Sequence, residues 1–235
     1  MNIVKRMVRR AWRGYRDRRA DPAVNPGCGE FEVDNWLISE FVLRKLVPAV
    51  GVHPYPLPEL HLMAAAVCRL KPGVIFEWGT HLGASARVFY ETARRFRIEI
   101  PIHSIDLPPD VDHGEHPRSQ RGRLVKGRPG VMLHLGDGLD KAAELYRALP
   151  RGRPPLVFID GDHAYPSVRR ELEGVMTEMP EAHILLHDTF YQSPEAGYNL
   201  GPYRAIQDVL ASRPHDYRML AAATGLPGMT LLYRP

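Results

Sequence analysis

Acidic side chains recur where short apolar runs of the sequence end. Four of five predicted strands end in an acid and the fifth runs into one two residues later; the five acids are Glu77, Asp106, Asp160, Asp188 and Asp137. In a doubly wound sheet, ligands bind outside the carboxyl ends of the strands. Carboxylates gathered at that edge attract a cationic ligand or a metal ion and repel phosphates. The spacing therefore predicts a binding edge for a positively charged molecule.

The turn after the first of these runs is rich in glycine and opens a helix. It reads EWGTHLGAS from Glu77 to Ser85. Gly79 would allow close backbone approach, and Gly83 would allow tight packing of the helix on the strand. A dinucleotide site would need a third glycine and would place a pyrophosphate at the helix N-terminus, beside the carboxylate of Glu77. S-adenosylmethionine fits better, because it has no phosphate and its ammonium and sulfonium groups outweigh its carboxylate.

Two further acids suit the remaining parts of such a cofactor. Asp106 can accept hydrogen bonds from both ribose hydroxyls, a role shared by NAD and S-adenosylmethionine sites. Asp137 and Gly138 follow the third predicted strand and could meet the adenine amino group, although Gly-Asp-Gly is also common in turns.

Alternating strand and helix patterns must position these residues. Strands are predicted at 74–77, 102–106, 131–135, 156–160 and 183–188, and helices at 84–96, 139–149, 165–176 and 203–211. This alternation is typical of βαβ units, in which helices cover both faces of a parallel sheet. The last two runs, 217–223 and 229–233, predict a closing hairpin. The predicted fold class is α/β: a Rossmann-like, doubly wound, mostly parallel sheet of about seven strands with a terminal antiparallel hairpin, plus N-terminal helices.

The N-terminal helices precede the alternating pattern. Asp34 is predicted to cap the first of them, and a proline-rich break at 53–58 separates it from a second helix at about 59–70. The predicted division of the chain is a basic arm at 1–20, a helical cap at 21–71 and a cofactor-binding domain at 72–235.

Two strings near the fourth and fifth strands resemble a known family. They are VFIDGDHAY from Val157 to Tyr165 and LLHDT from Leu185 to Thr189, with the glycine-rich turn upstream. Together they resemble class I S-adenosylmethionine-dependent methyltransferases, in the branch of small bacterial O-methyltransferases related to macrocin O-methyltransferase and cephalosporin-hydroxylase-like proteins. The resemblance covers about residues 72–235.

The resemblance implies a role for each matching residue. The methionine part of the cofactor would be surrounded by Glu77, Gly79, Gly83 and Ser85. Asp106 would hold the ribose, and Asp137 with Gly138 the adenine. In metal-dependent relatives, the acid at Asp160 and two oxygen ligands after the next strand hold magnesium. Here that pair is His187 and Asp188, and the substitution of an imidazole conflicts with the preference of Mg²⁺ for oxygen.

The catalytic residues implied by the resemblance are Asp160, His163 and His187. Catechol-type relatives carry a catalytic lysine three positions after the first acid, where this chain has His163. A histidine with an ordinary pKa of about 6.5 could remove a hydroxyl proton at neutral pH. His187 is the alternative base, and either histidine could instead be a hydrogen-bonded structural group. The side chains of Trp78 and Tyr165 are interpreted as packing, with a cofactor wall and a substrate contact as their alternatives.

Charge is distributed unevenly along the chain. Residues 1–20 hold eight Lys or Arg and one acid, so the net charge of +4 becomes −3 for the remaining residues. On a helix, the basic side chains of this arm lie opposite Val4, Met7, Val8, Trp12 and other apolar residues. The pattern predicts contact with an anionic membrane or an acidic protein; a structural arm docked on the body or on a sister subunit of a homodimer, or a targeting presequence, is the alternative. The acidic body argues against nucleic-acid binding, and two cysteines favour a reducing cytoplasm.

Three functions from different classes remain open at this stage. The first is O-methylation of a small hydroxylated metabolite, with S-adenosylmethionine and a divalent metal such as Mg²⁺ as cofactors. The second is a nicotinamide-dependent oxidoreductase, against which the missing third glycine and the crowded acids count. The third is a non-catalytic module attached to a membrane through the basic arm.

Overall fold

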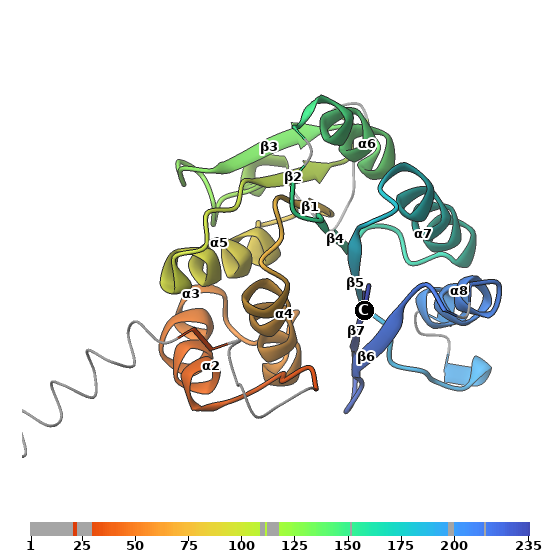
Figure 1. Cartoon of the computed structure of the whole chain (residues 1–235), viewed down its shortest axis with the longest axis horizontal. Helices are drawn as coiled ribbons and strands as arrows, with labels where there is room; N and C mark the ends of the chain where they lie inside the picture. The colour runs from red at the N-terminus through yellow and green to blue at the C-terminus, as the bar shows by residue number, and fades with distance from the viewer. Residues whose placement is uncertain are drawn as a thin grey trace, which may run out of the picture.

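A seven-stranded sheet forms the centre of the computed structural model (Figure 1). The structure describes residues 21–22, 30–108, 111, 118–150, 152–196, 200–213 and 215–235. The predicted basic arm at 1–20, part of the loop after the second strand and residues 197–199 lie outside this range. The strands are β1 (Ile75–Trp78), β2 (Ile102–Asp106), β3 (Val131–Leu135), β4 (Leu156–Ile159), β5 (His183–His187), β6 (Arg218–Ala222) and β7 (Met229–Tyr233).

The strand order is β3-β2-β1-β4-β5-β7-β6. The first five strands pair in parallel, whereas β7 runs antiparallel to β5 and to β6. The predicted parallel sheet and closing hairpin are therefore confirmed. A dinucleotide-binding fold has six strands in the order 3-2-1-4-5-6, so the antiparallel strand inserted next to β5 argues against the oxidoreductase alternative.

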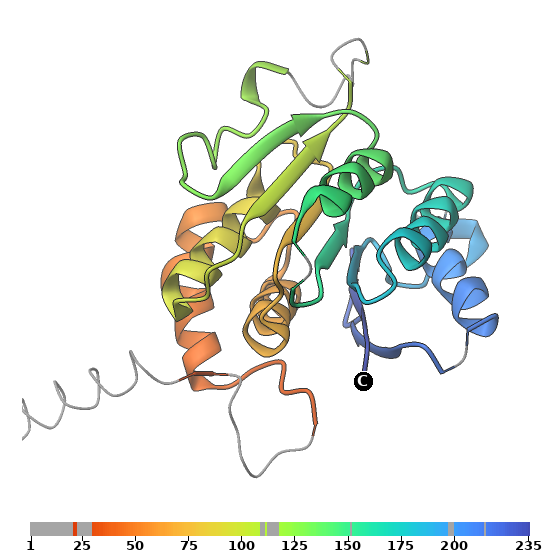
Figure 2. The same cartoon turned by 45° about the horizontal axis from the view of Figure 1, so that its top comes forward.

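Helices cover both faces of the sheet, as predicted, and Figures 1 and 2 show the two layers from different sides. One face carries α2 (Trp36–Phe41), the π-helix η1 (Val42–Leu46), α3 (Val47–Val50), α4 (Leu57–Leu70) and α5 (Ala84–Phe96). The other carries α6 (Gly138–Ala148), α7 (Tyr165–Glu178) and α8 (Leu200–Ala211). Short 3₁₀ turns are η2 (Arg118–Gln120) and η3 (Pro194–Ala196).

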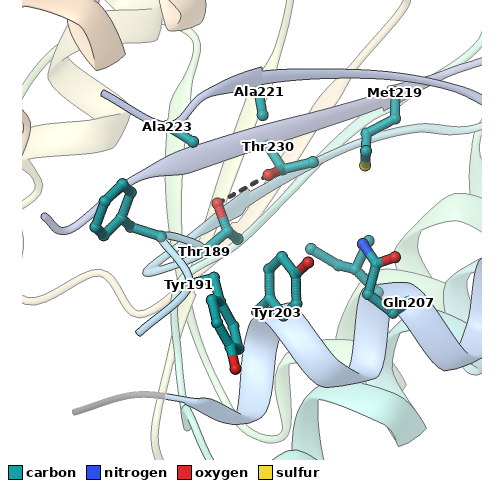
Figure 3. Close-up of a pocket in the computed structure, with 10 residues that line it drawn as sticks. Thr189, Tyr191, Tyr203, Gln207, Met219, Ala221, Ala223 and Thr230 are labelled. Carbon is teal, nitrogen blue, oxygen red and sulfur yellow. Dashed lines mark hydrogen bonds between the residues drawn. The ribbon is translucent and has the colours of Figure 1, made fainter. Parts of the chain in front are cut away.

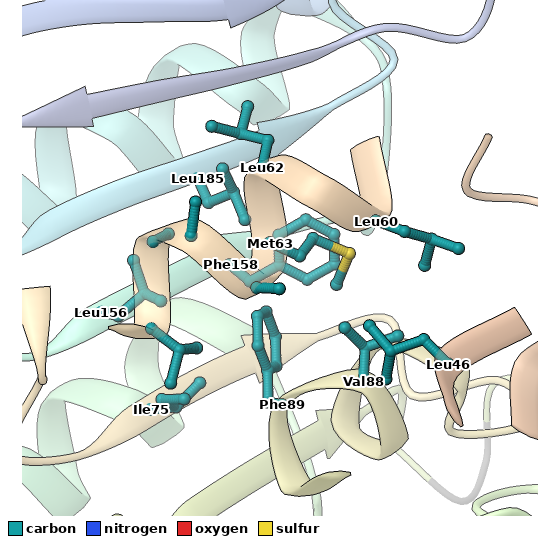
Figure 4. Packing of buried hydrophobic residues seen from close by; sticks show 14 of the residues in the cluster. Leu46, Leu60, Leu62, Met63, Ile75, Val88, Phe89, Leu156, Phe158 and Leu185 are labelled. Carbon is teal, nitrogen blue, oxygen red and sulfur yellow. The ribbon is translucent and has the colours of Figure 1, made fainter. Parts of the chain in front are cut away.

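The N-terminal helices share one core with the sheet. Phe158 of β4 lies against Phe89 of α5, with ring centroids 5.7 Å apart (Figure 4). The ring of Tyr55, just before α4, lies 6.0 Å from that of Phe158. Met63 and Leu62 of α4 are fully buried in the same cluster. Residues far upstream of the βαβ units are thus packed directly on the sheet, in a core that α4 shares with α2, η1 and α5.

The predicted cap of the first helix is wrong by one residue. Asn35, not Asp34, occupies the N-cap position, and its side-chain oxygen accepts hydrogen bonds from the backbone N–H groups of Leu37 and Ile38. Asp34 accepts a hydrogen bond from Ser39 instead. Asn and Asp cap helices about equally well, so two adjacent residues of this kind leave the starting point undetermined by sequence.

Candidate active site

The ends of β4 and β5 bring two aspartates and two histidines together. The parallel pairing of these strands continues to the residue before Asp160 and the residue before His187, so the two are neighbours. His187 Nδ1 lies 2.9 Å from Asp160 Oδ1 and 3.2 Å from Asp188 Oδ2. His163 Nε2 lies 2.9 Å from Asp188 Oδ2 and 3.6 Å from Asp160 Oδ1. These four residues, here called the strand-end cluster, each offer one ligand atom within 4.8 Å of the others.

Two residues from the N-terminal region, one just before α4 and one in it, complete this cluster, and sequence reasoning missed both. The Tyr55 hydroxyl donates a hydrogen bond of 2.6 Å to Asp160 Oδ2. Glu59 Oε2 lies 3.1 Å from His187 Nε2, and Glu59 Oε1 accepts a 2.8 Å hydrogen bond from the backbone N–H of Gly228. Both side chains are buried, Glu59 at 2% exposure. A glutamate almost never becomes buried without a partner. The position of Glu59 on the apolar face of α4 was therefore the one sign in the sequence that this side chain has a buried partner.

The charges of the strand-end cluster stabilise one another. Burial opposes ionisation, but the nearby His187 and His163 hold the pKa of Asp160 well below its usual range. The same two histidines lower the pKa of Asp188 against the effect of burial. Burial would lower the pKa of His163, yet hydrogen bonding to Asp160 and Asp188 raises it to about 9. The paired imidazole is therefore a stronger base than the free histidine assumed from the sequence, and it holds its proton at neutral pH.

Glu77 lies within β1 rather than at its end, because the strand continues to Trp78. Its side chain is fully buried, and its Oε1 accepts a hydrogen bond from the Ser104 hydroxyl of β2. Its Oε2 has no hydrogen bond of normal geometry among the described residues. Burial raises the pKa of Glu77 to about 7, although Ser104 and Ser85 favour the charged form. A buried carboxylate oxygen with unused hydrogen-bonding capacity is the feature that a cationic ligand would satisfy.

The two glycines of the turn are required for different reasons. Gly79 has φ of 91°, and a Cβ there would lie 1.9 Å from the backbone oxygen of Asp160, so the backbones of the β1 and β4 ends meet at this point. Gly83 has φ of 83° and is the N-cap of α5. A Cβ at Gly83 would meet Val125 at 2.9 Å, so the predicted helix–strand packing is wrong there: Gly83 packs against the segment before β3.

That segment lies on the glycine-rich turn. The backbone N–H groups of Gly122 and Leu124 donate to the carbonyl oxygens of His81 and Leu82, at 2.8 and 2.9 Å. Arg121 of the same segment forms a 2.7 Å ion pair with Asp106. The segment before β3 therefore already touches the acid predicted to hold the ribose.

Asp137 lies apart from the other strand-end acids. Its Oδ1 caps α6 by accepting from the backbone N–H of Asp140, and the carboxylate pairs with Arg170 of α7 at 2.9 Å. The next residue, Gly138, packs on an indole, because a Cβ there would lie 2.3 Å from Trp78. By contrast, Asp160 and Asp106 both raise the pKa of Glu77 through their charge, which places these three acids in one electrostatic environment. Of the five acids predicted at this edge of the sheet, Asp137 is paired with Arg170 of α7.

The two aromatic residues interpreted as packing do pack. Trp78 is 4% exposed within the core shared by α6 and α7. The Tyr165 hydroxyl donates to Asp208 of α8 at 2.8 Å, which joins α7 to α8. No contact of Tyr165 with the strand-end cluster occurs in the described part of the chain.

A pocket of about 160 Å³ lies between α8, β6, β7 and the segment that follows Asp188 (Figure 3). Thr189, the next residue along the chain, lines it and hydrogen-bonds Thr230 of β7 at 2.8 Å. Tyr191 and Tyr203 form one wall, with ring centroids 4.7 Å apart. A cavity of about 150 Å³ can hold benzene, so this pocket has room for one six-membered ring.

The described residues fit S-adenosylmethionine but not magnesium. The incompletely bonded Glu77 carboxylate and the close approach at Gly79 suit a cationic, phosphate-free ligand. The strand-end cluster presents two imidazole nitrogens beside two carboxylates, whereas Mg²⁺ demands oxygen ligands in near-octahedral geometry. In the described residues, no helix is long and apolar enough to cross a membrane.

The strand order, the helices on both faces and the acid-containing glycine-rich turn at β1 define the fold of class I S-adenosylmethionine-dependent methyltransferases. Residues 76–189 match the family model described as a methyltransferase domain, so this part of the chain is a methyltransferase domain. The resemblance inferred from the two strings is confirmed. No curated protein matches the chain in sequence.

Solved methyltransferases share this fold at low sequence identity. TomG, an O-methyltransferase from Streptomyces achromogenes involved in tomaymycin synthesis and solved with S-adenosylmethionine, has a TM-score of 0.58 and 20% identity over 88% of this chain and 99% of its own. The O-methyltransferase from Bacillus cereus, solved with S-adenosylhomocysteine, has a TM-score of 0.56 and 16% identity over 86% and 92%. The S-adenosylhomocysteine-bound methyltransferase PaMTH1 from Podospora anserina has a TM-score of 0.53 and 16% identity over 88% and 100%.

Proposed function

We propose that the protein is an S-adenosylmethionine-dependent O-methyltransferase that acts on a small hydroxylated molecule at the strand-end cluster. The observation that supports this most directly is the distance of 2.9 Å between His163 Nε2 and Asp188 Oδ2. His163 follows the end of β4, the strand that pairs with β1 just before Gly79. A carboxylate that orients an imidazole is the arrangement by which many enzymes remove a hydroxyl proton. The O-methyltransferases TomG and that of Bacillus cereus share the fold.

The cofactor supplies a methyl group made electrophilic by its sulfonium. Glu77 holds the cationic methionine part, and Asp106, once Arg121 moves aside, accepts from the ribose. Asp137 and Gly138 stay proposed neighbours of the adenine, although Asp137 would keep its ion pair with Arg170. The acceptor hydroxyl approaches in line with the methyl carbon, and such alignment can lower a barrier by roughly 7–11 kcal/mol.

The neutral form of His163, a minor fraction at pH 7 because its pKa is about 9, would take the proton of the acceptor hydroxyl as the new oxygen–carbon bond forms and the carbon–sulfur bond breaks. Asp188, whose Oδ2 lies 2.9 Å from His163 Nε2, stabilises the charge of the imidazole, and Asp160 adds a second carboxylate at 3.6 Å. His187 is held between Glu59 and Asp160 and is buried, so it is less accessible to an acceptor than His163.

The aromatic pocket beside Asp188 suits the non-reacting part of the acceptor. Tyr191 and Tyr203 offer ring faces, and Gln207 offers a polar group on the same wall. A molecule with one hydroxyl at the strand-end cluster and a six-membered ring in the pocket matches this arrangement.

Calorimetry and a transfer assay test the proposal together. The protein should bind S-adenosylmethionine and not NAD, and should transfer the methyl group to members of a panel of phenols, catechols and sugars. Asp160→Asn and His163→Ala should lose transfer while they keep cofactor binding, and the exposed His215→Ala should behave as the wild type. Binding of NAD alone, or full activity in both cluster variants, would overturn the assignment.

A peripheral membrane contact through residues 1–20 is proposed from their sequence pattern alone. Removal of these residues should abolish sedimentation with vesicles of anionic lipid. Unchanged sedimentation would leave the acidic protein partner, the homodimer contact or the presequence as the interpretation of the arm.

A further inference from the structure

The segment before β3 has a high density of basic side chains. Residues 118–130 contain four arginines and one lysine and no aspartate or glutamate. The chain after residue 20 has a net charge of −3, so this segment is a local exception to an acidic body. The segment is fixed on the fold, because Arg87 Nη1 of α5 donates a 2.9 Å hydrogen bond to the carbonyl oxygen of Leu124, and Val125 is buried in the core.

The outer surface of α5 adds further bases beside this segment. The guanidinium of Arg128 lies 5.7 Å from the centre of the Tyr90 ring of α5. Arg94 is one turn further along the same surface of the helix, and Arg97 is its C-cap residue. Five basic side chains that are exposed or half-buried, here called the basic face, therefore come from α5 and the segment: Arg94, Arg97, Arg123, Lys126 and Arg128.

The charges of the basic face are not neutralised by acids. None of its five side chains forms an ion pair in the part of the chain that the structure describes. Their neighbours Arg87 and Arg121 are instead paired with Glu91 and Asp106. Like charges gathered on one surface repel one another, and an anionic partner relieves that repulsion. The chemistry of this surface thus calls for a negatively charged partner.

Two exposed leucines lie beside the bases. Leu133 and Leu135 of β3 are each 47% exposed and point to the same side of the sheet, because side chains alternate along a strand. Leu133 adjoins the basic segment, since a Cβ at Gly122 would lie 2.5 Å from its Cδ1. Surfaces that lie on a membrane combine apolar side chains with bases that attract anionic lipids. The leucines therefore favour a lipid surface over a nucleic acid.

We propose that the basic face, together with Leu133 and Leu135, binds the surface of an anionic membrane. The inference extends the proposed contact of residues 1–20 to the folded body, and it rests on that proposal only for the choice of a membrane as the partner. The arm, with eight bases, supplies the larger share of the attraction, and the basic face fixes the orientation of the body.

This orientation has a consequence for the proposed cofactor site. The backbone N–H groups of Gly122 and Leu124 are hydrogen-bonded to the glycine-rich turn at His81 and Leu82. The segment that contacts the lipid is thus joined to the turn that opens α5. Membrane binding therefore holds the cofactor site beside the lipid headgroups.

Sedimentation with vesicles tests the basic face in the full-length chain, whose arm is intact. Wild type should bind vesicles that contain phosphatidylserine and not vesicles of phosphatidylcholine alone. A base near an anionic bilayer strengthens binding about fivefold, so the double variant Arg123→Gln/Lys126→Gln should bind about 25-fold more weakly. The matched control, Arg204→Gln/Arg218→Gln, removes two exposed charges from α8 and β6 and should bind as the wild type does.

Two further measurements separate the contributions of charge and apolar contact. Salt at about 1 M screens charges beyond about 3 Å, so the difference between the Arg123→Gln/Lys126→Gln variant and the wild type should disappear there. Leu133→Ser keeps every charge and should weaken binding about fivefold through the lost apolar contact. Circular dichroism and thermal unfolding would establish that each variant is folded.

Three results would overturn the inference. They are equal binding by the basic-face and control variants, equally tight binding to phosphatidylcholine alone, and binding of a nucleic-acid duplex through Arg123 and Lys126 with no binding to vesicles. The arm is tested separately by removal of residues 1–20, so either contact can fail while the other is retained. Neither experiment measures methyl transfer, so the proposed enzymatic activity stands or falls independently.

Discussion

Replacement of Glu77 by glutamine should weaken binding of S-adenosylmethionine in a manner that depends on pH. Glu77 is buried, and one of its carboxylate oxygens has no hydrogen bond of normal geometry among the described residues. The proposed site uses its negative charge to hold the cationic methionine part. Glutamine keeps the size of the side chain and its hydrogen bond from Ser104, but removes the charge.

The magnitude follows from the raised pKa of Glu77, about 7. A hydrogen bond to a charged group contributes about 1.5–3 kcal/mol, so Glu77→Gln should raise the Kd about 10- to 150-fold at pH 8. At pH 8 about nine-tenths of the free wild-type protein has an ionised Glu77, and at pH 6 only about one-tenth. The cation binds the ionised form, so the ratio of the two Kd values should shrink about tenfold between pH 8 and pH 6.

Calorimetric titration of both proteins at pH 6, 7 and 8 measures this ratio of Kd values. Protonation of the cofactor itself affects both Kd values equally at a given pH, so it does not change their ratio. Glu171→Gln is the matched control, because burial also raises the pKa of Glu171 to about 7. Glu171 lies on α7 on the other face of the sheet, so its variant should bind the cofactor normally at each pH. A ratio for Glu77→Gln that is near one, or equal at pH 6 and pH 8, would refute the electrostatic reasoning.

Three other changes report on stability and on the acceptor. Burial raises the folded-state pKa of Glu171 from its ordinary value of 4.5 to about 7, so the folded protein loses stability as pH rises through 7. Glu171→Gln should therefore raise the free energy of unfolding by up to about 3 kcal/mol at pH 8 and by little at pH 4.5. Urea unfolding measures both values, and equal effects at the two pH values would contradict this reasoning. Phe158→Ala, which empties the centre of the core, should cost about 3–5 kcal/mol in the same assay, and a loss below 1 kcal/mol would show that the core collapses into the space. Tyr203→Ala should raise the KM for a ring-containing acceptor and leave the Kd of the cofactor unchanged; an unchanged KM would remove the pocket from the acceptor site.

The fold was predictable because its signals are local. Period-two and period-3.6 patterns are set by neighbouring residues, so α5, β2, β3 and β7 begin and end where predicted. The strand ends of β1, β4 and β5 differ by one residue, because the last residue of a strand depends on its pairing with a neighbour. The helix boundaries of α7 and α8 differ by a few residues for the same reason: packing of one helix on the other extends both beyond their periodic segments.

The candidate site was only partly predictable, because part of it depends on distant contacts. The cluster of Asp160, His187 and Asp188 follows from parallel pairing of two strands that the sequence identifies. Tyr55 and Glu59 reach the same cluster from 105 and 128 residues away along the chain, and no motif joins them to it. The pairing of Asp137 with Arg170 could not be predicted either, since an exposed acid after a strand has many basic side chains within reach.

The hydrogen bond from Gly228 to Glu59 spans 169 residues and determines when the site can come into existence. During synthesis, the N-terminal helices leave the ribosome long before the last hairpin does. Until Gly228 emerges, Glu59 lacks this backbone donor, and the strand that pairs with β5 is missing as well. A nascent chain can therefore build most of its hydrophobic interior early, but it cannot assemble its chemistry until the hairpin of β6 and β7 has emerged.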